Sequence, residues 1–221
     1  MSRLEAEGAE VWCIVLAAGR GSRFGGPKQW ADVEGERLVD RVVRTASAAC
    51  DHVVVVLPPG QAWDGPPVED RVDGGAERAD SVRAGLASVP DGADVVVVAD
   101  AAHPLAGADL FRALIDAVLA GADGAVPVLP MLEIVQRVEE GRVVATLPKE
   151  GTCLTQMPHA FRAHRLRRVH ADAPRVVDDS TLLVESGMRV VPVPGQPWNL
   201  HVSTPVDLEV LRRLSDLPVV T

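Results

Sequence analysis

The feature that most constrains the fold is a series of short, almost wholly apolar runs separated by segments with helical spacing. Val11–Leu16, Val53–Leu57 and Val95–Ala99 have the composition of strands buried on both faces. Leu38–Ala49 and Arg78–Ser88, which lie between them, show the spacing of helices. Continuous valine-rich strands that alternate with helices are typical of a parallel sheet covered on both sides. The sequence therefore predicts an α/β fold, with a Rossmann-like, mainly parallel sheet flanked by helices.

The pattern changes after Ala125–Leu129. Glu133–Val138 and Arg142–Leu147 flank a Glu-Glu-Gly turn, which predicts a β-hairpin. The hairpin has few large apolar side chains of its own, so we expect it to project and to pack on a partner subunit. We expect one domain over residues 1–221, with residues 131–158 as a projecting β-arm. The remaining predicted elements are helices over Ala108–Ala120, Ala160–Val169 and Asp179–Ser186, a strand over Met188–Val193, and a last helix opened by Thr204 and Pro205.

Composition narrows the class of protein. The chain has 221 residues and a net charge of −9, which disfavours non-specific binding to nucleic acid or to anionic membranes. No apolar run approaches the roughly 18 residues that a membrane-spanning helix requires, and the first residues are acidic. The three cysteines show no paired spacing typical of a disulfide framework or a metal site. These features lead us to expect a cytoplasmic protein.

A glycine-rich loop follows the first predicted strand directly. Ala17–Gln29 contains four glycines, which let the backbone turn sharply and present N–H groups to an anion. Arg20, Arg23 and Lys28 add positive charge to the same loop, and the chain has only two lysines against twenty arginines. Such a loop lies at the carboxyl edge of a parallel sheet, where ligands bind. The loop therefore favours a nucleoside triphosphate as ligand.

The glycine spacing also permits a different interpretation. Gly19-x-Gly21-x-x-x-Gly25 resembles a dinucleotide-binding pattern, which would make the chain an NAD(P)-dependent oxidoreductase. Against this, the second predicted strand ends in Leu57-Pro58, without the acidic residue that would bind a ribose, and the chain has no tyrosine. The loop also lacks the Gly-Lys-Ser/Thr of a Walker A motif.

Several motifs together carry a resemblance to a known family. Leu16-Ala-Ala-Gly-x-Gly-x-Arg23 followed by Pro27-Lys28-Gln29 resembles the loop of the 2-C-methyl-D-erythritol 4-phosphate cytidylyltransferase group. The loop alone is shared with other nucleotidyltransferases, but the set of motifs is more specific and follows the family order along nearly the whole chain. The further matching segments are Gly74–Val82, Asp100–Pro104, Asp178–Thr181 and Asn199–Leu208.

The resemblance implies an activity and a set of site residues. The family transfers CMP from CTP to a phosphorylated acceptor, uses Mg²⁺, and exchanges its β-arm across a homodimer so that the arm reaches the neighbouring active site. By residue match, the catalytic cations are Arg23 and Lys28. The implied nucleotide contacts are Ala17, Ala18, Gly19, Gly21, Gly75, Arg78, Ser81, Asp100 and Ala101. The implied acceptor contacts are His103, Thr146, Arg162 and His201, and the implied metal contacts are Asp100 and Asn199.

The acceptor half departs from the family pattern. His103 stands where the family has arginine, and His201 stands where it has lysine. Leu129-Pro130-Met131 and Met157-Pro158-His159 replace the usual entry to the hairpin and the usual Thr-Pro-Gln, while Arg162 lies one position from the expected arginine. The favoured acceptor is 2-C-methyl-D-erythritol 4-phosphate. Two alternatives stay open. The acceptor is another polyol phosphate or a phosphonate, or the chain is a nucleotide-binding protein without catalytic activity.

Overall fold

The computed structural model describes residues 8–176 and 178–215, and an eight-stranded sheet forms the centre of this part. Its strands are β1 (Val11–Leu16), β4 (His52–Leu57), β5 (Asp70–Asp73), β6 (Val95–Asp100), β7 (Gly124–Pro130), β10 (Cys153–Thr155), β11 (His159–Arg162) and β12 (Val190–Pro194). The strand order is β10-β7-β11-β6-β1-β4-β5, and β12 pairs with β7.

The sheet has a parallel half and a mixed half. β1 pairs in parallel with both β4 and β6, and β5 pairs in parallel with β4. On the other side β11 lies antiparallel between β6 and β7, and β10 runs antiparallel to β7. The mainly parallel sheet predicted from the valine-rich runs is therefore confirmed, and the antiparallel strands lie on the side from which the hairpin departs.

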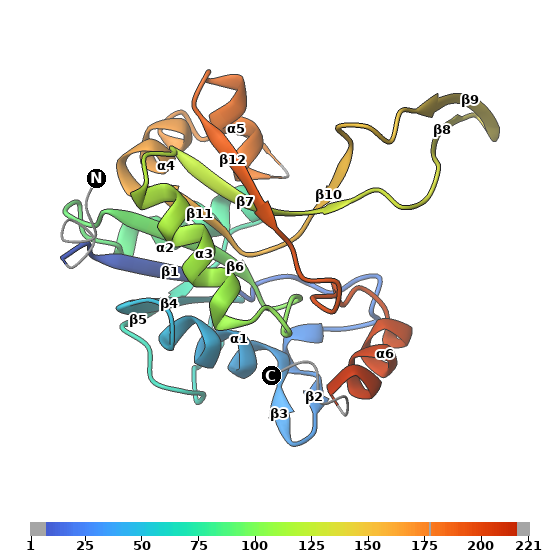
Figure 1. The fold of residues 1–221 in the computed structure, drawn as a ribbon. Coiled ribbons are helices and arrows are strands. Elements are labelled where there is room, and N and C mark those ends of the chain that lie inside the picture. Colours follow the sequence, from blue (N-terminus) through green and yellow to red (C-terminus); the bar gives the residue numbers. More distant parts are fainter. Residues whose placement is uncertain (1–7, 177, 216–221) are drawn as a thin grey trace.

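Helices cover both faces of the sheet (Figure 1). The helices are η1 (Lys28–Trp30), α1 (Leu38–Ser47), α2 (Arg78–Ser88), α3 (Ala108–Leu119), α4 (Ala163–His170), α5 (Asp179–Glu185) and α6 (Pro205–Ser215). Cys13 and Val15 of β1 point into a core shared with α1 and α3, whereas Ile14 points into a core shared with α2, α4 and α5. Alternate residues of one strand thus enter opposite cores, which explains why the strand has no polar face.

A third, smaller core joins the C-terminal segment to the region after the glycine-rich loop. Leu208 and Leu211 of α6 pack with Val33, Leu38 and Val202. The short antiparallel pair β2 (Asp32–Val33) and β3 (Glu36–Arg37) lies at the same place. The final helix therefore anchors the segment that contains His201 beside the segment that follows Lys28.

The predicted hairpin is confirmed as two antiparallel strands, β8 (Val135–Glu139) and β9 (Arg142–Leu147). Within the described residues it pairs with no strand of the main sheet. Figure 1 shows it at the end of an extended arm, far from the body of the molecule. Ile134, Val143 and Leu154 on the arm are more than half exposed.

The structure corrects the prediction of a helix over Ala160–Val169. Residues 159–162 form β11, and the helix α4 begins only at Ala163. The reason is tertiary, because this short segment fills the place between β6 and β7 and pairs with both. Such pairing overrides local helix preference. The edge strand β5 was not predicted, since its sequence Asp-Arg-Val-Asp has no apolar run.

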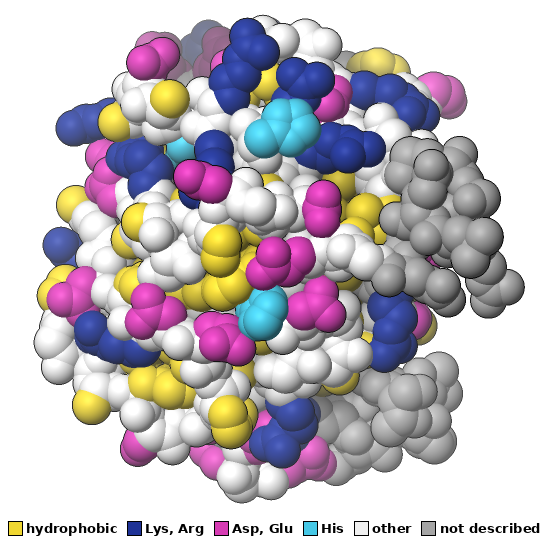
Figure 2. Space-filling view, turned by 90° about the vertical axis from the view of Figure 1, so that its left-hand side faces the viewer, with side chains coloured by type: hydrophobic (Ala, Val, Ile, Leu, Met, Phe, Trp, Pro, Cys, Tyr) yellow, Lys and Arg dark blue, Asp and Glu magenta, His cyan; other side chains and the backbone are white. Residues whose placement is uncertain are grey.

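The surface carries mixed charge on the face shown in Figure 2, where basic side chains gather toward the top and acidic ones surround a histidine near the middle. The basic run on α4 is largely engaged with the protein itself. Arg165 lies 3.0 Å from Asp123, and Arg167 donates to the carbonyl oxygens of Leu86 and Val89.

Across the described ranges, no helix is both long and apolar enough to cross a membrane.

Candidate active site

The carboxyl ends of four adjacent strands, β6, β1, β4 and β5, lie together and bring the predicted nucleotide motifs to one place. Leu16 at the end of β1 pairs with Asp100 at the end of β6, and Leu57 at the end of β4 pairs with Asp73 of β5. The loops that follow these strands therefore meet at one edge of the sheet. They enclose a cavity of about 770 Å³. The predicted site residues that line it are Ala17, Ala18, Gly19, Gly21, Arg23, Lys28, Gly75, Arg78, Ser81, Asp100, Ala101, His103 and His201.

The glycine-rich loop turns sharply at Gly21. Its φ of +62° lies in the left-handed region, which glycine adopts without strain. The Gly21 carbonyl oxygen accepts hydrogen bonds from the N–H groups of Phe24, Gly25 and Gly26, at 2.9, 3.0 and 3.2 Å. A Cβ atom at Gly21 would lie 1.8 Å from the Gly26 carbonyl oxygen. This position therefore needs glycine for its conformation and for its space.

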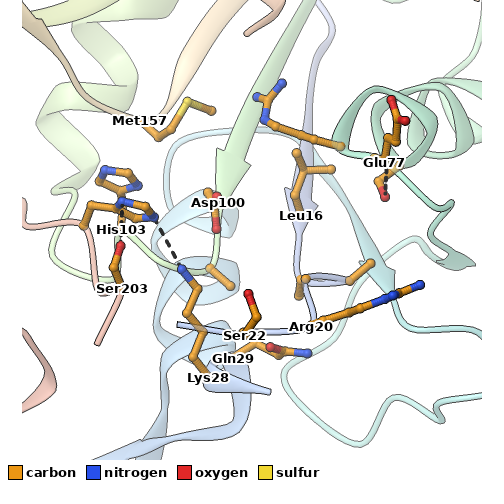
Figure 3. A pocket seen from close by; sticks show the side chains of 18 of the residues that line it. Leu16, Arg20, Ser22, Lys28, Gln29, Glu77, Asp100, His103, Met157 and Ser203 are labelled. Atoms are coloured by element: carbon orange, nitrogen blue, oxygen red, sulfur yellow. Dashed lines mark hydrogen bonds between the residues drawn. The ribbon is translucent and has the colours of Figure 1, made fainter. Parts of the chain in front are cut away.

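Lys28 begins the short helix η1, and its side chain reaches into the cavity beside Asp100 and His103 (Figure 3). Its Nζ donates to the Val202 carbonyl oxygen at 2.7 Å and lies 3.3 Å from His201 Nε2. Burial lowers the pKa of Lys28, and the negative charge of Asp100 partly opposes that shift. The carboxylates of Asp100 and Asp207 are the charges that favour the protonated ammonium form of Lys28.

The two histidines of the acceptor half form a stacked pair. The rings of His103 and His201 lie 4.8 Å apart with an interplanar angle of 9°. Burial lowers the pKa of His103 to about 4, although Asp100 acts in the opposite direction. Burial also lowers the pKa of His201, and the neighbouring Lys28 lowers it further. Both rings are therefore neutral at pH 7 in the free protein.

Asp100 supplies a carboxylate to the same cavity. Its Oδ1 accepts a hydrogen bond from the Ala102 N–H at 2.8 Å, which fixes the carboxylate at the strand end. Among the described residues, no group of three or more histidines, cysteines or acids could hold a metal by itself. Mg²⁺ is commonly bound by one or two carboxylates together with substrate phosphates, so a single fixed carboxylate beside a phosphate loop fits that ion.

The segment after β5 forms another wall. The Gly75 N–H donates to Ser81 Oγ at 3.2 Å, which ties the segment to the first turn of α2. Arg78 lines the cavity, and its Nη1 donates to Asp179 Oδ2 at 2.6 Å. Asp179 is fully buried and also lies 2.9 Å from His170 Nε2. The guanidinium and the imidazole hold the pKa of Asp179 below its usual value despite burial.

Three predicted site residues do not line the cavity of their own chain. Thr146 is exposed on β9, at the far end of the arm. Arg162 pairs with Val95, at the opposite end of β6 from Asp100, and its Nη2 donates to the Val118 carbonyl oxygen. The expected contact of Arg162 with an acceptor in this cavity is therefore corrected, because the sheet register places it at the wrong edge.

Asn199 does not line the cavity either, and its expected metal contact stays a prediction. Asn199 is 1% exposed, and its Nδ2 donates to the Met157 carbonyl oxygen at 2.7 Å. The side chain therefore joins the C-terminal segment to the segment before β11, behind the cavity wall. Its Oδ1 is buried and has no hydrogen-bond partner among the described residues.

Sequence reasoning missed several residues of the site. Asp178 and Asp179 matched a family motif in the sequence, with capping of the following helix as the alternative. In the structure Asp178 lines the cavity and caps α5 by accepting from the Ser180 N–H at 2.7 Å, whereas Asp179 is buried behind it against Arg78. The ion pair between Asp179 and Arg78 joins residues 101 positions apart, and no local pattern signals such a contact. Other cavity residues without a role in the predictions are Thr155, Met157 and Ser203.

Comparison with known proteins gives a consistent result. A family model described as 2-C-methyl-D-erythritol 4-phosphate cytidylyltransferase matches residues 11–213. The protein of that name from Streptomyces avermitilis is 36% identical, over 97% of this chain and 98% of its own length. A bifunctional enzyme IspD/IspF from Anaeromyxobacter dehalogenans is 40% identical over 97% of this chain, which spans 59% of that protein's length.

Solved structures agree with the sequence comparison. The crystal structure of 2-C-methyl-D-erythritol 4-phosphate cytidylyltransferase from Thermus thermophilus matches with a TM-score of 0.82 and 28% identity. The match covers 94% of this chain and 100% of that one. The glycine spacing is therefore that of a nucleotidyltransferase loop and not of a dinucleotide-binding fold. The chain belongs to the 2-C-methyl-D-erythritol 4-phosphate cytidylyltransferase family of CTP-dependent nucleotidyltransferases.

Proposed function

We propose that this protein transfers CMP from CTP to 2-C-methyl-D-erythritol 4-phosphate and releases pyrophosphate. One observation carries the proposal. A single cavity at the carboxyl edge of the sheet holds the glycine-rich loop, the Lys28 ammonium, the Gly75–Ser81 segment and the Asp100 carboxylate. The relatives that match nearly end to end bear the name of this activity.

The chemistry needs little from the protein beyond binding and charge. A phosphate oxygen of the acceptor forms a bond to the α-phosphorus of CTP, and the bond from that phosphorus to the bridging oxygen breaks. The electron pair leaves with pyrophosphate. The attacking phosphate is already anionic, so no side chain has to act as nucleophile or general base. Arg23 and Lys28, which both line the cavity, stabilise the negative charge that develops on the phosphoryl oxygens.

We propose Mg²⁺ as the cofactor, with Asp100 as the carboxylate that would hold it together with the triphosphate. When bound, the ion would neutralise phosphate charge. Asp100 is suited to this because its Oδ1 is fixed by the Ala102 N–H and the side chain faces the cavity. In a variant with Asp100→Asn, isothermal titration of Mg²⁺ against the CTP complex should show weaker binding.

The acceptor assignment needs its own test, because His103 and His201 are neutral where the family pattern has two cations. We propose to measure pyrophosphate release with CTP and a panel of acceptors that contains methylerythritol phosphate, ribitol phosphate and a phosphonate. Turnover of methylerythritol phosphate alone supports the proposal. Turnover only of another acceptor would keep the chemistry and replace the substrate.

Lys28→Ala tests the proposed role of the loop. We expect pyrophosphate release to fall by about 100-fold or more, since one positioned charge in phosphoryl-type transfer contributes an effect of that order. Arg44→Ala, which removes an exposed cation from α1, is the matched control and should retain activity. A fully active Lys28→Ala variant would contradict the assignment.

The neutral histidine pair also favours a second candidate, a nucleotide-binding protein without transferase activity. This candidate predicts that the protein binds CTP in a titration but releases no pyrophosphate with any phosphorylated polyol. Binding with turnover excludes it.

We further propose that the protein is a homodimer in which the β-arm, residues 131–158, reaches the neighbouring active site. The arm exposes Leu132, Ile134 and Val143 at 78%, 65% and 59%, and these side chains have no apolar partner in the core clusters of the described residues. Burying such a surface against a second copy would remove apolar area from water. Ile134→Asp should therefore weaken dimerisation in analytical ultracentrifugation, whereas Val206→Asp on α6, 70% exposed, should not.

A mixing experiment tests whether Thr146 acts in the neighbouring site. Lys28→Ala and Thr146→Ala subunits, each weakly active alone, should regain activity when mixed. In the mixed dimer, one site would combine an intact Lys28 with an intact Thr146 from the other subunit. Failure to regain activity would place Thr146 outside the neighbour's site.

We also propose a cytoplasmic location, which the three free cysteines support because thiols persist in reducing compartments.

A further inference from the structure

His201 is held in place by the backbone on both sides of it. The Val202 N–H donates to the Ala102 carbonyl oxygen at 2.8 Å, and Val202 itself is fully buried in the small core with α6. Two residues earlier, Asn199 is bonded to the Met157 carbonyl oxygen. The imidazole therefore projects from a fixed strip of chain beside His103, whose ring covers one of its faces.

Both ring nitrogens of His201 already have partners. Nε2 lies 3.3 Å from Lys28 Nζ, and Nδ1 lies 3.2 Å from Ser203 Oγ. An ammonium group can only donate hydrogen bonds, so Nε2 must accept and carry no proton. The proton of the neutral ring then belongs to Nδ1, which donates to Ser203 Oγ. This leaves no nitrogen of His201 free to bind an acceptor molecule.

The same contacts define where the Lys28 ammonium points. The group has three N–H donors. One donates to the Val202 carbonyl oxygen at 2.7 Å and one to His201 Nε2. The third remains for a ligand in the cavity that Lys28 lines. Two fixed acceptors on consecutive residues thus restrict a long, flexible side chain, whose ordering would otherwise oppose phosphate binding.

We propose that His201 is a positioning residue for Lys28 and not a ligand of the acceptor. Its Nε2 and the neighbouring Val202 carbonyl aim the third N–H of Lys28 into the cavity, and the stacked His103 ring keeps the imidazole in the plane that this requires. The kinetic part of this inference rests on the proposed transferase activity, whereas the contact with Lys28 does not.

The test uses two substitutions that separate the hydrogen bond from the ring. His201→Phe keeps a flat ring against His103 but cannot accept from Lys28. His201→Gln loses the aromatic ring but places an oxygen near the position of Nε2. We expect kcat for pyrophosphate release to fall by about 10- to 100-fold in His201→Phe, as for loss of one hydrogen bond to a charged group. The kcat of His201→Gln should lie within about three-fold of the parent value. The KM for the acceptor should change less than about two-fold in both variants.

The opposite pattern would overturn the proposal. If His201→Phe mainly raises the acceptor KM at unchanged kcat, His201 binds the acceptor. If His201→Gln is as slow as His201→Phe, the accepting atom at Nε2 has no part in positioning Lys28.

A spectroscopic readout decides the contact without activity, because the chain contains only two lysines. In NMR spectra of protein labelled with ¹³C-lysine, the two Hε protons of a lysine have different chemical shifts when its side chain is fixed in one conformation. The Lys149→Arg variant identifies which signal belongs to Lys28. We expect the Hε splitting of Lys28 to collapse in His201→Phe and to persist in His201→Gln. An unchanged splitting in His201→Phe overturns the inference. If the parent protein releases no pyrophosphate with any acceptor, the proposed function fails, and this signal still decides the role of His201.

Discussion

Gly21→Ala should disable the nucleotide loop while leaving the fold intact. The substitution forces an L-residue to φ +62°, which costs roughly 1–2 kcal/mol. The new Cβ would also lie 1.8 Å from the Gly26 carbonyl oxygen, and real contacts of this kind are not shorter than 3.0 Å. The backbone from Gly21 to Gly26 must therefore move by more than about 1 Å, and misplacement of that size in a reacting complex can cost about 100-fold in rate.

The assay is pyrophosphate release at varied CTP, together with a CTP titration and a melting curve. We expect kcat/KM for CTP to fall by about 100-fold, with a fall in melting temperature of only about 2–8 °C, the equivalent of roughly 1–2 kcal/mol of strain in a chain of this size. Gly25→Ala is the matched control. Gly25 also has a positive φ, +89°, but its Cβ would meet nothing within 4 Å. Its kcat/KM for CTP should fall by no more than about 30-fold, the equivalent of roughly 1–2 kcal/mol of conformational strain alone.

Equal losses in the two variants would refute the steric argument and leave only backbone conformation as the cause. Near-normal CTP binding by Gly21→Ala would refute the stronger idea that the turn at Gly21 shapes the phosphate site. A large fall in melting temperature for Gly21→Ala alone would show that the loop supports the fold.

Two further predictions concern buried charge. Asp179→Asn should lower the free energy of unfolding by about 2–4 kcal/mol in urea titrations, because it leaves Arg78 and His170 without their carboxylate partner; an unchanged value would show that the ion pair contributes nothing net. Burial lowers the pKa of His103 to about 4 and also lowers that of His159, so the unfolded chain takes up protons first as the pH falls below about 6.5. We expect unfolding free energy to drop by at least about 2 kcal/mol between pH 7 and pH 5, and to drop less in His159→Leu; identical slopes in parent and variant would contradict this.

The parts of the fold predicted from sequence are those with a strong local pattern. The valine runs of β1, β4 and β6 predict buried strands, and the helix over Arg78–Ser88 was predicted with the bounds that the structure shows. Strands β5 and β11 were missed because each is held by pairing with a neighbour and not by its own composition. Local periodicity carries no information about such pairing.

The candidate site divides in the same way. Its nucleotide half lies on loops that directly follow β1, β5 and β6. The predicted strands β1 and β6 already imply that the glycine-rich loop and Asp100 meet, whereas the Gly75–Ser81 segment was assigned by the family motif alone, because β5 was not predicted. The acceptor half depends on contacts between distant segments. Arg162 shows the difference, because its position in the sequence suggested the site, and the register of β11 against β6 places it at the other end of the sheet.

The two departures from the family pattern, His103 and His201, are best understood as one change. The hydrogen bond from the Val202 N–H to the Ala102 carbonyl oxygen holds the two segments side by side, so the two side chains must share one space. An arginine and a lysine there would add two like charges beside Lys28, with Asp100 and Asp207 as the nearby negative charges. Two flat neutral rings stack instead at 4.8 Å, and one of them accepts from Lys28. Because the stack needs both rings, replacing either histidine alone by the family's cation would place a charge against a neutral ring without restoring the original pair of cations.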